Sequence, residues 1–486
     1  MPKFMGVKSD IIDFYQLNYL WKIVKEEEKK GKLKKNYFSD SVIKLSSFLK
    51  QKRKEFRSIP KIKRKDCQNE IDEIKEELDS MKKSEISECA KVIFSGKAQV
   101  NIKKTIIKDH EVFVASDLNS MIISQLIKLE LRRSYRLRPA NRDMIIDQIK
   151  ALLDNPMPKV VIRADIQSFF ESISQEKIIK KLADDNFISN RSLKYLRKFM
   201  YEYNISKNSH TELGVPRGLA FSSYMAELYL NQIDKEIKYV EGVYFYKRYV
   251  DDIIIVADPK MFSAENYWEL VNSIFENNSL SLHNIFPKKY IQIFDQTTNN
   301  AEFEYLGYHF SYSEGRLKIG LSSKRYCKYK TLIDIVFENY KRSSNYRKGK
   351  NSGTCRHKLR RDALSLLFKR LKIITSNGIL SGRKNYVATG IYYSNKFITD
   401  FSQLELLDKY LYEKITNKDC FNPSRKLFNY GAQNNYDKNI QIIKQKLGSF
   451  SFIEGFKSRK LHKSSMYSKI LSDLQKMYNL NNADNE

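Results

Sequence analysis

The sequence predicts an α+β protein in which a mixed central segment is flanked by two helical segments. Between residues 106 and 320, short β-branched runs alternate with helical stretches. The runs occupy residues 160–162, 253–256 and 290–294, and the helical stretches include 143–153, 175–184, 190–202 and 222–238. Residues 1–105 and 321–486 carry charged, helical patterns with little strand signal. We therefore expect a sheet covered by helices, with a helical N-terminal extension and a basic, helical C-terminal region.

The charge of the chain predicts an anionic partner. The 486 residues carry a formal net charge of +30, and 30% of them are charged. Nucleic acid is the usual partner of so large an excess, and a membrane surface is the alternative. No stretch approaches the roughly 18 consecutive apolar residues of a spanning helix. The first residues show no apolar run before a small-residue cleavage site, so we expect an intracellular protein without a membrane partner.

The N-terminal segment is predicted to contain an amphipathic helix. Between residues 62 and 94, apolar side chains recur at three- and four-residue steps with Lys and Glu between them, namely Ile71, Ile74, Leu78 and Met81. This spacing favours a helix that packs one face, alone or in a short coiled-coil hairpin. An arm that binds a partner is the alternative interpretation.

Three aspartates are predicted to lie where strands end. Asp165 follows the run at 160–162, and Asp251 and Asp252 stand between two β-rich runs, at the turn of a hairpin. Adjacent carboxylates repel each other, so divalent cations would stabilise them. Hard oxygen ligands from separate strands suit Mg²⁺. Asp165 and Asp251 could hold two ions about 4 Å apart, the spacing of two-metal phosphoryl transfer.

A tight loop is predicted between these aspartates. The segment Gly214-Val215-Pro216-Arg217-Gly218 precedes the helical stretch at 222–238. Glycine has no side chain, so a base or a sugar could approach the backbone closely there. An ordinary loop before a helix is the alternative.

The order of these motifs resembles the palm of reverse transcriptases. The matching segments are Asp165 with Phe170 five residues later, Gly214-x-Pro216-x-Gly218 with Ser222, and Arg248-Tyr249-x-Asp251-Asp252. Two further segments are similar to the lysine-bearing segment and the primer grip of that family, namely Leu282–Lys289 and Phe303–Phe310. The resemblance covers about residues 130–320. It implies a right-hand polymerase, with a helical extension at 1–105, fingers and palm with an antiparallel sheet at 106–320, and a thumb and C-terminal region at 321–486.

The resemblance implies a role for each matching residue of the palm. Asp165, Asp251 and Asp252 would bind the metal ions together with the backbone carbonyl of Ile166. The ring of Phe170 would fill the space of a ribose 2′-hydroxyl and so select deoxynucleotides.

A lysine of the family's motif would donate a proton to the leaving pyrophosphate. Either Lys288 or Lys289 could be this lysine, and the sequence leaves the choice open.

The resemblance also implies contacts with nucleotide and primer. Arg136 and Arg138 would bind the triphosphate of the incoming nucleotide, because guanidinium groups suit phosphate oxygens. Arg217 replaces the glutamine of many family members, and a cation beside Gly218 would favour a phosphate. Tyr305, Leu306 and Gly307 would form the primer grip.

The implied activity is that of an RNA-directed DNA polymerase that uses dNTPs and two Mg²⁺ ions, with Mn²⁺ as a possible substitute. The segment Ser222–Glu227, with Ala226-Glu227 after its serines, looks most like bacterial abortive-infection and defence-associated reverse transcriptases. That likeness implies a cytoplasmic bacterial enzyme that copies a non-coding RNA in antiphage defence. Phe170 and Val250 stand where a viral RNA-dependent RNA polymerase would normally carry Asp and Gly.

Three alternatives stay open at this point. A retron enzyme is similar, although the nearest likeness to its Val-Thr-Gly marker, Val387–Gly390, comes late in the chain. Template-independent synthesis, or synthesis primed by a protein hydroxyl, is the second. The third is a non-catalytic RNA-binding scaffold, which the three carboxylates disfavour because unpaired charges are costly to keep. The oligomeric state is not predicted.

Overall fold

The computed structural model divides the chain into two compact units. The first consists of Met1–Ala140 and Ala164–Lys289, and the second of Asn141–Arg163 and Tyr290–Glu486. The structure describes residues 14–31, 33, 35–56, 64–107, 110–137, 140–208, 211–345, 353–380, 387–417, 419, 421, 433–462 and 465–483. The three-part division at residues 105 and 320 stays a prediction.

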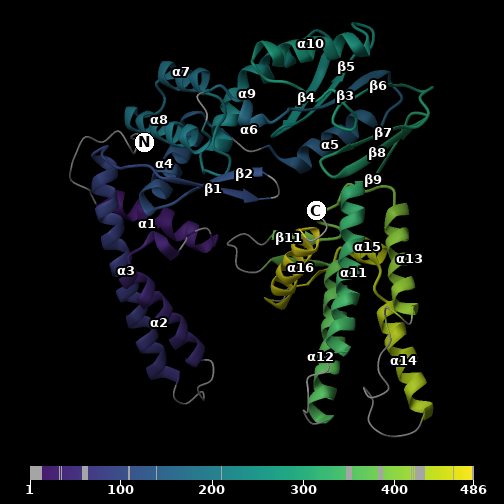
Figure 1. Cartoon of the computed structure of the whole chain (residues 1–486). Helices are drawn as coiled ribbons and strands as arrows, with labels where there is room; N and C mark the ends of the chain where they lie inside the picture. The colour runs from purple at the N-terminus through teal and green to yellow at the C-terminus, as the bar shows by residue number, and fades with distance from the viewer. Residues whose placement is uncertain are drawn as a thin grey trace. The chain divides into compact units, whose positions relative to one another are not determined.

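The first unit begins with a helical extension, as the spacing of apolar residues predicted. Helix α1 (Phe14–Lys29) packs on α3 (Arg64–Phe94), and α2 (Asp40–Phe56) runs alongside α3 (Figure 1). Ile71 and Leu78 on α3 are only 4% and 5% exposed. The stripe is therefore a packing face of one continuous helix, and α3 pairs with α2, a helix that the pattern at residues 62–94 did not include.

A hairpin and three helices follow in this unit. They are β1 (Ile102–Ile107), β2 (His110–Ala115), α4 (Leu118–Ser134), α7 (Gln175–Asp185) and α8 (Asn190–Ser206). β1 and β2 pair antiparallel, and α4 packs against α3, α8 and β2. The side chain of Asp117 caps α4 by accepting a hydrogen bond from the backbone N–H of Ser120, which satisfies one of the free donors of the first turn.

The sheet of the first unit carries the residues that the sequence singled out. Its strands are the end of β3 (Lys159–Asp165), β4 (Val243–Tyr249) and β5 (Asp252–Ala257). The helices of this part of the chain are α6 (Phe169–Ser172), α9 (Ser222–Lys238) and α10 (Ala264–Asn277). β4 and β5 are antiparallel neighbours, and β5 lies next to β3. α9 covers β4, and α10 packs on α9. The side chains of residues 253–257 are completely buried, so β5 is a central strand.

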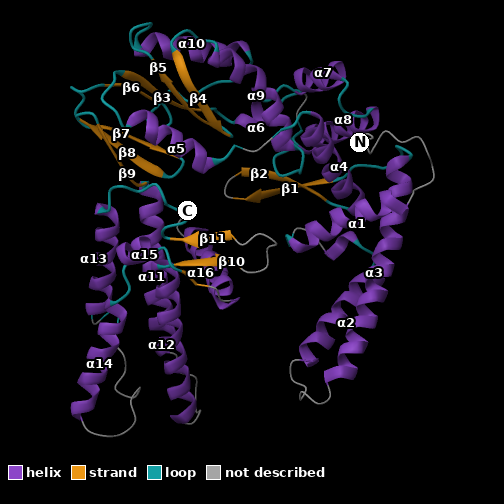
Figure 2. Cartoon of the chain, turned by 180° about the vertical axis from the view of Figure 1, so that it is seen from behind, coloured by secondary structure: helices purple, strands orange, loops and turns teal. Residues whose placement is uncertain are grey.

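The second unit begins with helix α5 (Arg142–Leu153), which is followed by two sets of antiparallel strands. The first five residues of β3 pair with β6 (Tyr290–Phe294). The strands β7 (Ala301–Tyr305), β8 (Tyr308–Ser313) and β9 (Arg316–Leu321) form a three-stranded sheet in chain order (Figure 2). Alternate residues of β8 are fully buried, which is the period-two pattern of a sheet with one packed face.

The rest of the second unit is helical, as predicted, with one addition. The helices are α11 (Ser323–Asn345), α12 (Gly353–Thr375), α13 (Ser402–Thr416), α14 (Gln433–Gly448), α15 (Phe452–Ser458) and α16 (Ser465–Ala483). A small sheet in the order β11-β10-β12 lies among them, built from β10 (Asn377–Leu380), β11 (Val387–Gly390) and β12 (Leu461–His462). These strands were not predicted from the sequence, because two to four residues are too few to show a period.

Both units combine helices with antiparallel sheets, so the predicted α+β class is confirmed. Among the helices that the structure describes, none combines the length and apolarity needed to cross a membrane.

Candidate active site

The structure brings Asp165 and Asp251 together at the end of the sheet. The backbone N–H of Ile166 donates to the carbonyl of Asp251 at 3.4 Å, and the N–H of His283 donates to the carbonyl of Asp165 at 2.9 Å. Ile166 also forms an isolated antiparallel bridge with Leu282. The chain leaving β3 is therefore held between the β4–β5 turn and the segment around residue 282. Backbone hydrogen bonds, rather than side chains, set the spacing of the two carboxylates.

The β4–β5 turn presents its aspartates from a strained backbone. Tyr249 pairs with Asp252, so Val250 and Asp251 form a two-residue turn. Val250 has a φ of +63°, which a β-branched residue rarely adopts. Such a conformation costs on the order of 1–3 kcal/mol and persists only where its surroundings hold it.

The buried side chain of Arg248 holds this turn in place. Its Nη1 donates to the carbonyl of Val250 at 2.8 Å, and its other hydrogen bonds go to Glu227 and Asp234 on α9 at 2.9–3.1 Å. Tyr246 also donates to Asp234, at 2.6 Å. Burial would lower the pKa of Arg248, but the hydrogen bonds to Asp234 and Glu227 outweigh burial and raise it. The guanidinium is therefore a permanent cation that ties the turn to α9.

This network was not predicted from the sequence. The sequence singled out Glu227 only within the segment that resembles defence-associated reverse transcriptases, and it did not single out Asp234. Both lie on α9 seven residues apart, which places them on one face two turns from each other. That spacing was the available signal.

The carboxylates of the site disfavour one another. Burial raises the pKa of Asp251, and the charges of Asp165 and Asp252 raise it further, whereas Arg217 lowers it. A divalent cation would offset this repulsion, and the carboxylate and carbonyl oxygens here are the donors that Mg²⁺ and Mn²⁺ prefer.

Among the described residues, no three His, Cys, Asp or Glu side chains converge closely enough to hold an ion by themselves. The donor set fits a Mg²⁺ ion that takes one or two carboxylates and completes its shell with carbonyl, water and substrate phosphate oxygens.

The two candidate lysines have different surroundings. The Nζ of Lys288 lies 2.8 Å from Oδ2 of Asp165 and 2.9 Å from Nε2 of His283. The Nζ of Lys289 instead lies 4.2 Å from the centre of the Trp268 ring on α10. The structure therefore brings Lys288 to the carboxylates and places Lys289 against an aromatic side chain. His283, which is 3.5 Å from Asp165, is a further neighbour that the sequence analysis did not single out.

Phe170 and Arg217 are stacked near the carboxylates. The guanidinium of Arg217 lies 5.1 Å from the centre of the Phe170 ring. Its Nη2 also forms an ion pair with Glu171 at 3.4 Å. The sequence predicted a cation for phosphate at Arg217, and the structure adds a carboxylate partner and an aromatic support for it.

Only glycine fits at position 218, because the backbone there packs directly against β2. Gly218 has a φ of +105°, and a Cβ there would lie 2.5 Å from Cγ1 of Val112 and 2.7 Å from the carbonyl of Phe113. The N–H of Phe113 donates to the carbonyl of Arg217 at 2.7 Å. The close approach at this glycine is thus with β2.

We expect Gly218→Ala to destabilise the protein by about 2–4 kcal/mol, because backbone strain and a clash with β2 add together. The free energy of unfolding in urea measures the loss. Gly96→Ala is the matched control, since Gly96 has a φ of +74° and nothing lies within 4 Å of its Cβ position. It should cost only about 1–2 kcal/mol. Equal losses in both variants would show that packing against β2 contributes nothing.

Of the two arginines predicted to bind the triphosphate, the structure describes Arg136. Arg136 is exposed in the segment after α4 and has a φ of +51°. Arg138 lies outside the described residues. The structure does not bring Arg136 into contact with the carboxylates.

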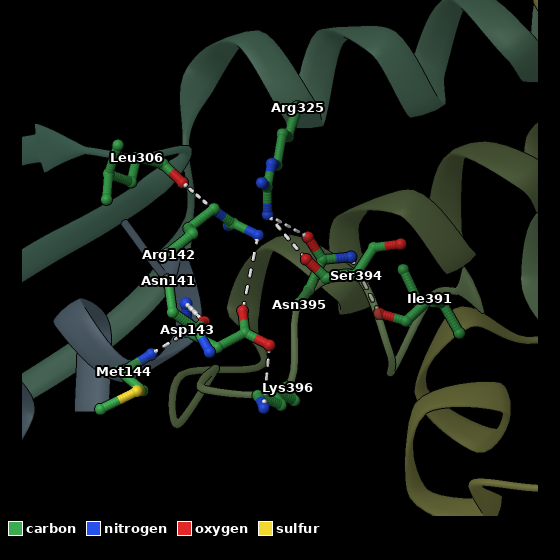
Figure 3. Close-up of polar contacts among 10 residues, drawn as sticks. All are labelled: Asn141, Arg142, Asp143, Met144, Leu306, Arg325, Ile391, Ser394, Asn395 and Lys396. Carbon is green, nitrogen blue, oxygen red and sulfur yellow. Dashed lines mark hydrogen bonds and ion pairs between the residues drawn. The ribbon is translucent and has the colours of Figure 1, made fainter. Parts of the chain in front are cut away.

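The Tyr305–Gly307 segment belongs to the second unit and forms a rigid turn there. Leu306 and Gly307 have φ values of +46° and +79°, as a two-residue hairpin turn requires. Nε of Arg142 donates to the carbonyl of Leu306 at 2.9 Å (Figure 3). A Cβ on Gly307 would lie 2.5 Å from Nε of Arg325, so this guanidinium packs directly on the turn.

Residues 100–310 match the protein family described as reverse transcriptase (RNA-dependent DNA polymerase). No curated protein sequence matches the chain.

Two solved structures are similar to part of the chain at low sequence identity. Telomerase from Candida albicans in complex with a fragment of telomeric RNA shares 12% identity, with a TM-score of 0.35 over 78% of this chain and 65% of that chain. Apo telomerase from Candida tropicalis shares 11% identity, with a TM-score of 0.34 over 78% of this chain and 65% of that one. The chain thus covers less than two thirds of each.

Proposed function

We propose that this chain, whose residues 100–310 are a reverse-transcriptase domain, is as a whole an RNA-directed DNA polymerase that makes DNA from dNTPs. The observation that carries the proposal is the meeting of Asp165 with the turn at Asp251. Acidic side chains from separate strands, joined by the carbonyl of Ile166, are the ligands that two-metal phosphoryl transfer requires. Asp252, next to the turn, would support them.

The residues around the carboxylates would bind the metal ions, select the sugar and position the nucleotide. Two Mg²⁺ ions, when bound, would lower the pKa of the primer 3′-hydroxyl and neutralise the charge on the departing pyrophosphate. Asp165 and Asp251 would hold and space these ions. Phe170, held by Arg217, would exclude a 2′-hydroxyl, and Arg217 would direct a phosphate. The Tyr305–Gly307 turn would hold the primer.

RNA-templated synthesis by the purified protein tests this proposal. The assay supplies an RNA template with an annealed DNA primer, labelled dNTPs and Mg²⁺, and compares it with EDTA, with no template and with the RNA that co-purifies. We expect products that follow the RNA sequence and disappear in EDTA. Products without a template would favour template-independent synthesis. No product under any condition would favour a non-catalytic scaffold.

Lys288 is proposed to protonate the leaving pyrophosphate, because it contacts Asp165 while Lys289 lies on Trp268. We expect Lys288→Ala to slow single-nucleotide incorporation by about a hundredfold, within the range for loss of a general acid. Lys289→Ala is the matched control and should change the rate by less than about threefold. Equal effects of the two substitutions would remove the assignment of Lys288.

Phe170→Ala is expected to reduce discrimination against ribonucleotides. Removing the ring opens space for the 2′-hydroxyl, and steric selection of one small group corresponds to roughly 10–200-fold. The ratio of kcat/KM for dATP and ATP measures it. Tyr201→Ala, at an aromatic residue on α8 that is 66% exposed, is the control. An unchanged ratio would show that Phe170 does not select the sugar.

A bacterial antiphage role, with a non-coding RNA as template, is the finer part of the proposal. Its support is the resemblance at Ala226-Glu227. Ala226 is buried and Glu227 pairs with Arg248, so both residues also have structural roles.

Sequencing the RNA that co-purifies from the cytoplasm of the native bacterium tests the template. One dominant non-coding RNA supports it, and a sample of total cellular RNA contradicts it. Mass spectrometry that finds a nucleotide covalently attached to the protein would instead support protein priming.

A further inference from the structure

The second unit contains a cavity of about 250 Å³ that the proposed polymerase reaction does not use. It lies between α11, the end of α12, the chain from β11 to Asn395, and α16. We infer that this cavity binds a single nucleotide unit, with a phosphate at its cationic end and a base on its aromatic wall. This site goes beyond the proposed function, because none of its residues belongs to the palm.

The charge of the lining favours an anion. Arg325 and Lys328 line the cavity, and no lining residue is acidic. Nη1 of Arg325 donates to the carbonyl of Ser394 at 2.9 Å and to Oδ1 of Asn395 at 2.7 Å, so the guanidinium is fixed in place (Figure 3). No carboxylate of the described residues forms an ion pair with it. These two acceptors use Nη1, so the donors left for a ligand are those of Nε and Nη2, which lie beside the Gly307 turn.

A second arginine adds to this positive charge. Arg142 and Arg325 lie 4.8 Å and 5.2 Å from the centre of the Tyr308 ring, and their guanidinium groups face each other beside Leu306 (Figure 3). Burial lowers the pKa of Arg325, and the charge of Arg142 lowers it further. Nη2 of Arg142 is buried without a hydrogen-bond partner in the described part of the chain. A phosphate near Arg325 would reduce the repulsion between these groups.

An aromatic wall of the cavity, built from residues of α11 and α16, offers rings and hydrogen bonds to a base. Tyr329, Tyr467 and Tyr478 line the cavity, and Nζ of Lys328 lies 5.5 Å from the centre of the Tyr478 ring. Nucleic-acid bases stack on aromatic side chains whatever their sequence, because every base has a π-face. Gln475 lies on the same wall and offers an amide that can both donate and accept.

Tyr467 is built into this wall. It is 4% exposed, and its hydroxyl is buried with no hydrogen-bond partner among the described residues. A Cβ on Gly378 of β10 would lie 2.5 Å from the Tyr467 ring, so the ring lies flat on this glycine. Tyr329 is fixed as well, since its hydroxyl accepts a hydrogen bond from Asn395 at 3.1 Å. The wall is therefore rigid, and the Tyr467 hydroxyl is available to a ligand.

The size of the cavity limits the ligand to one nucleotide unit. A volume of about 250 Å³ is slightly below the range of about 300–1,000 Å³ that drug-sized ligands occupy. One base with its sugar and phosphate can enter such an opening, whereas a stacked dinucleotide cannot. The unit can come from a free nucleotide or from the end of a strand, and both share a phosphate and a base.

Calorimetric titration of the full chain with dAMP in EDTA tests the inference. A test substitution and its control are both placed on α11. Lys328→Glu reverses a charge at the cavity, and we expect it to weaken the Kd for dAMP by about tenfold or more. Lys324→Glu, one turn earlier on the exposed face of α11 and outside the lining, should change it by less than about twofold. Leu471→Trp fills the cavity from α16 and should abolish binding.

Further titrations separate the ligand groups and their source. Deoxyadenosine and inorganic phosphate should each bind at least about tenfold more weakly than dAMP, because each lacks one half of the contacts. A 5′-phosphorylated oligodeoxyadenylate that binds as tightly as dAMP assigns the site to a strand end, and weaker binding assigns it to free nucleotides.

Absence of dAMP binding would overturn the inference, and so would equal binding by wild type and Lys328→Glu. Because no metal is present, and DNA synthesis is measured separately, failure here is distinct from failure of the proposed polymerase activity.

Discussion

Asp251→Asn is expected to reduce DNA synthesis by roughly 10³-fold, because a lost metal contact removes several kcal/mol of charge stabilisation and each 1.36 kcal/mol is tenfold in rate. Single-nucleotide incorporation on an RNA template measures the loss. The substitution keeps the size of the side chain, so the turn should keep its shape.

The stability of this variant should not fall. The pKa of Asp251 is raised by burial and by its acidic neighbours, so above that pKa its charge disfavours the folded state. Asn removes that charge, and the free energy of unfolding at neutral pH should equal or exceed that of wild type in the absence of metal. The difference should vanish as the pH falls below the pKa of the carboxyl group.

Asp184→Asn, at an exposed residue of α7, is the control for loss of a negative charge and should leave both measurements unchanged. An Asp251→Asn variant that retains activity within tenfold of wild type would exclude Asp251 as a metal ligand. A variant that unfolds much more easily would show that the turn needs the charge for structure.

Arg248→Met is expected to destabilise the protein by about 3 kcal/mol. Its side chain is 6% exposed, and its loss would leave Glu227 and Asp234 without their cation. Breaking a buried ion pair by removing one partner costs about 3–5 kcal/mol, and the 21–30% exposure of the two carboxylates favours the lower end. Val250 would also lose the hydrogen bond to its carbonyl. Urea unfolding measures the loss, and DNA synthesis should fall because the strained turn is released.

Two further variants separate charge from geometry. Arg248→Lys keeps the cation but lacks the fork that reaches both carboxylates, so an intermediate loss is expected. Combining Arg248→Met with Glu227→Gln and Asp234→Asn removes the stranded charges and should recover part of the stability. If Arg248→Met unfolds at the wild-type urea midpoint, the network has no structural role.

Periodicity in the sequence predicted several of the regular elements. The spacing of apolar residues indicated α3 and its buried face, and β-branched runs indicated β3, β5 and β6 at the observed places. These signals are strong because long helices and central strands repeat a packing pattern over many residues. The small β10–β12 sheet has no such repeat, and contacts with distant segments form it.

Part of the site could be predicted in the same way. Carboxylates at strand ends, with a family order of motifs, indicated that Asp165 and Asp251 would meet, and the structure places them together. Their metal-binding role stays a prediction. Partners joined by tertiary contacts had no local signal, and these include Glu171 beside Arg217 and His283 beside Asp165.

By itself, the sequence determined the fold class, the places of several long elements and the acidic turn, because these follow from local repeats and from residue types at strand ends. The tertiary structure alone decided which lysine faces the carboxylates and why Gly218 must be a glycine. It also showed what holds the strained turn at Val250. Each of these depends on a neighbour distant in the chain, and its position is set only when α9, β2 and α10 pack.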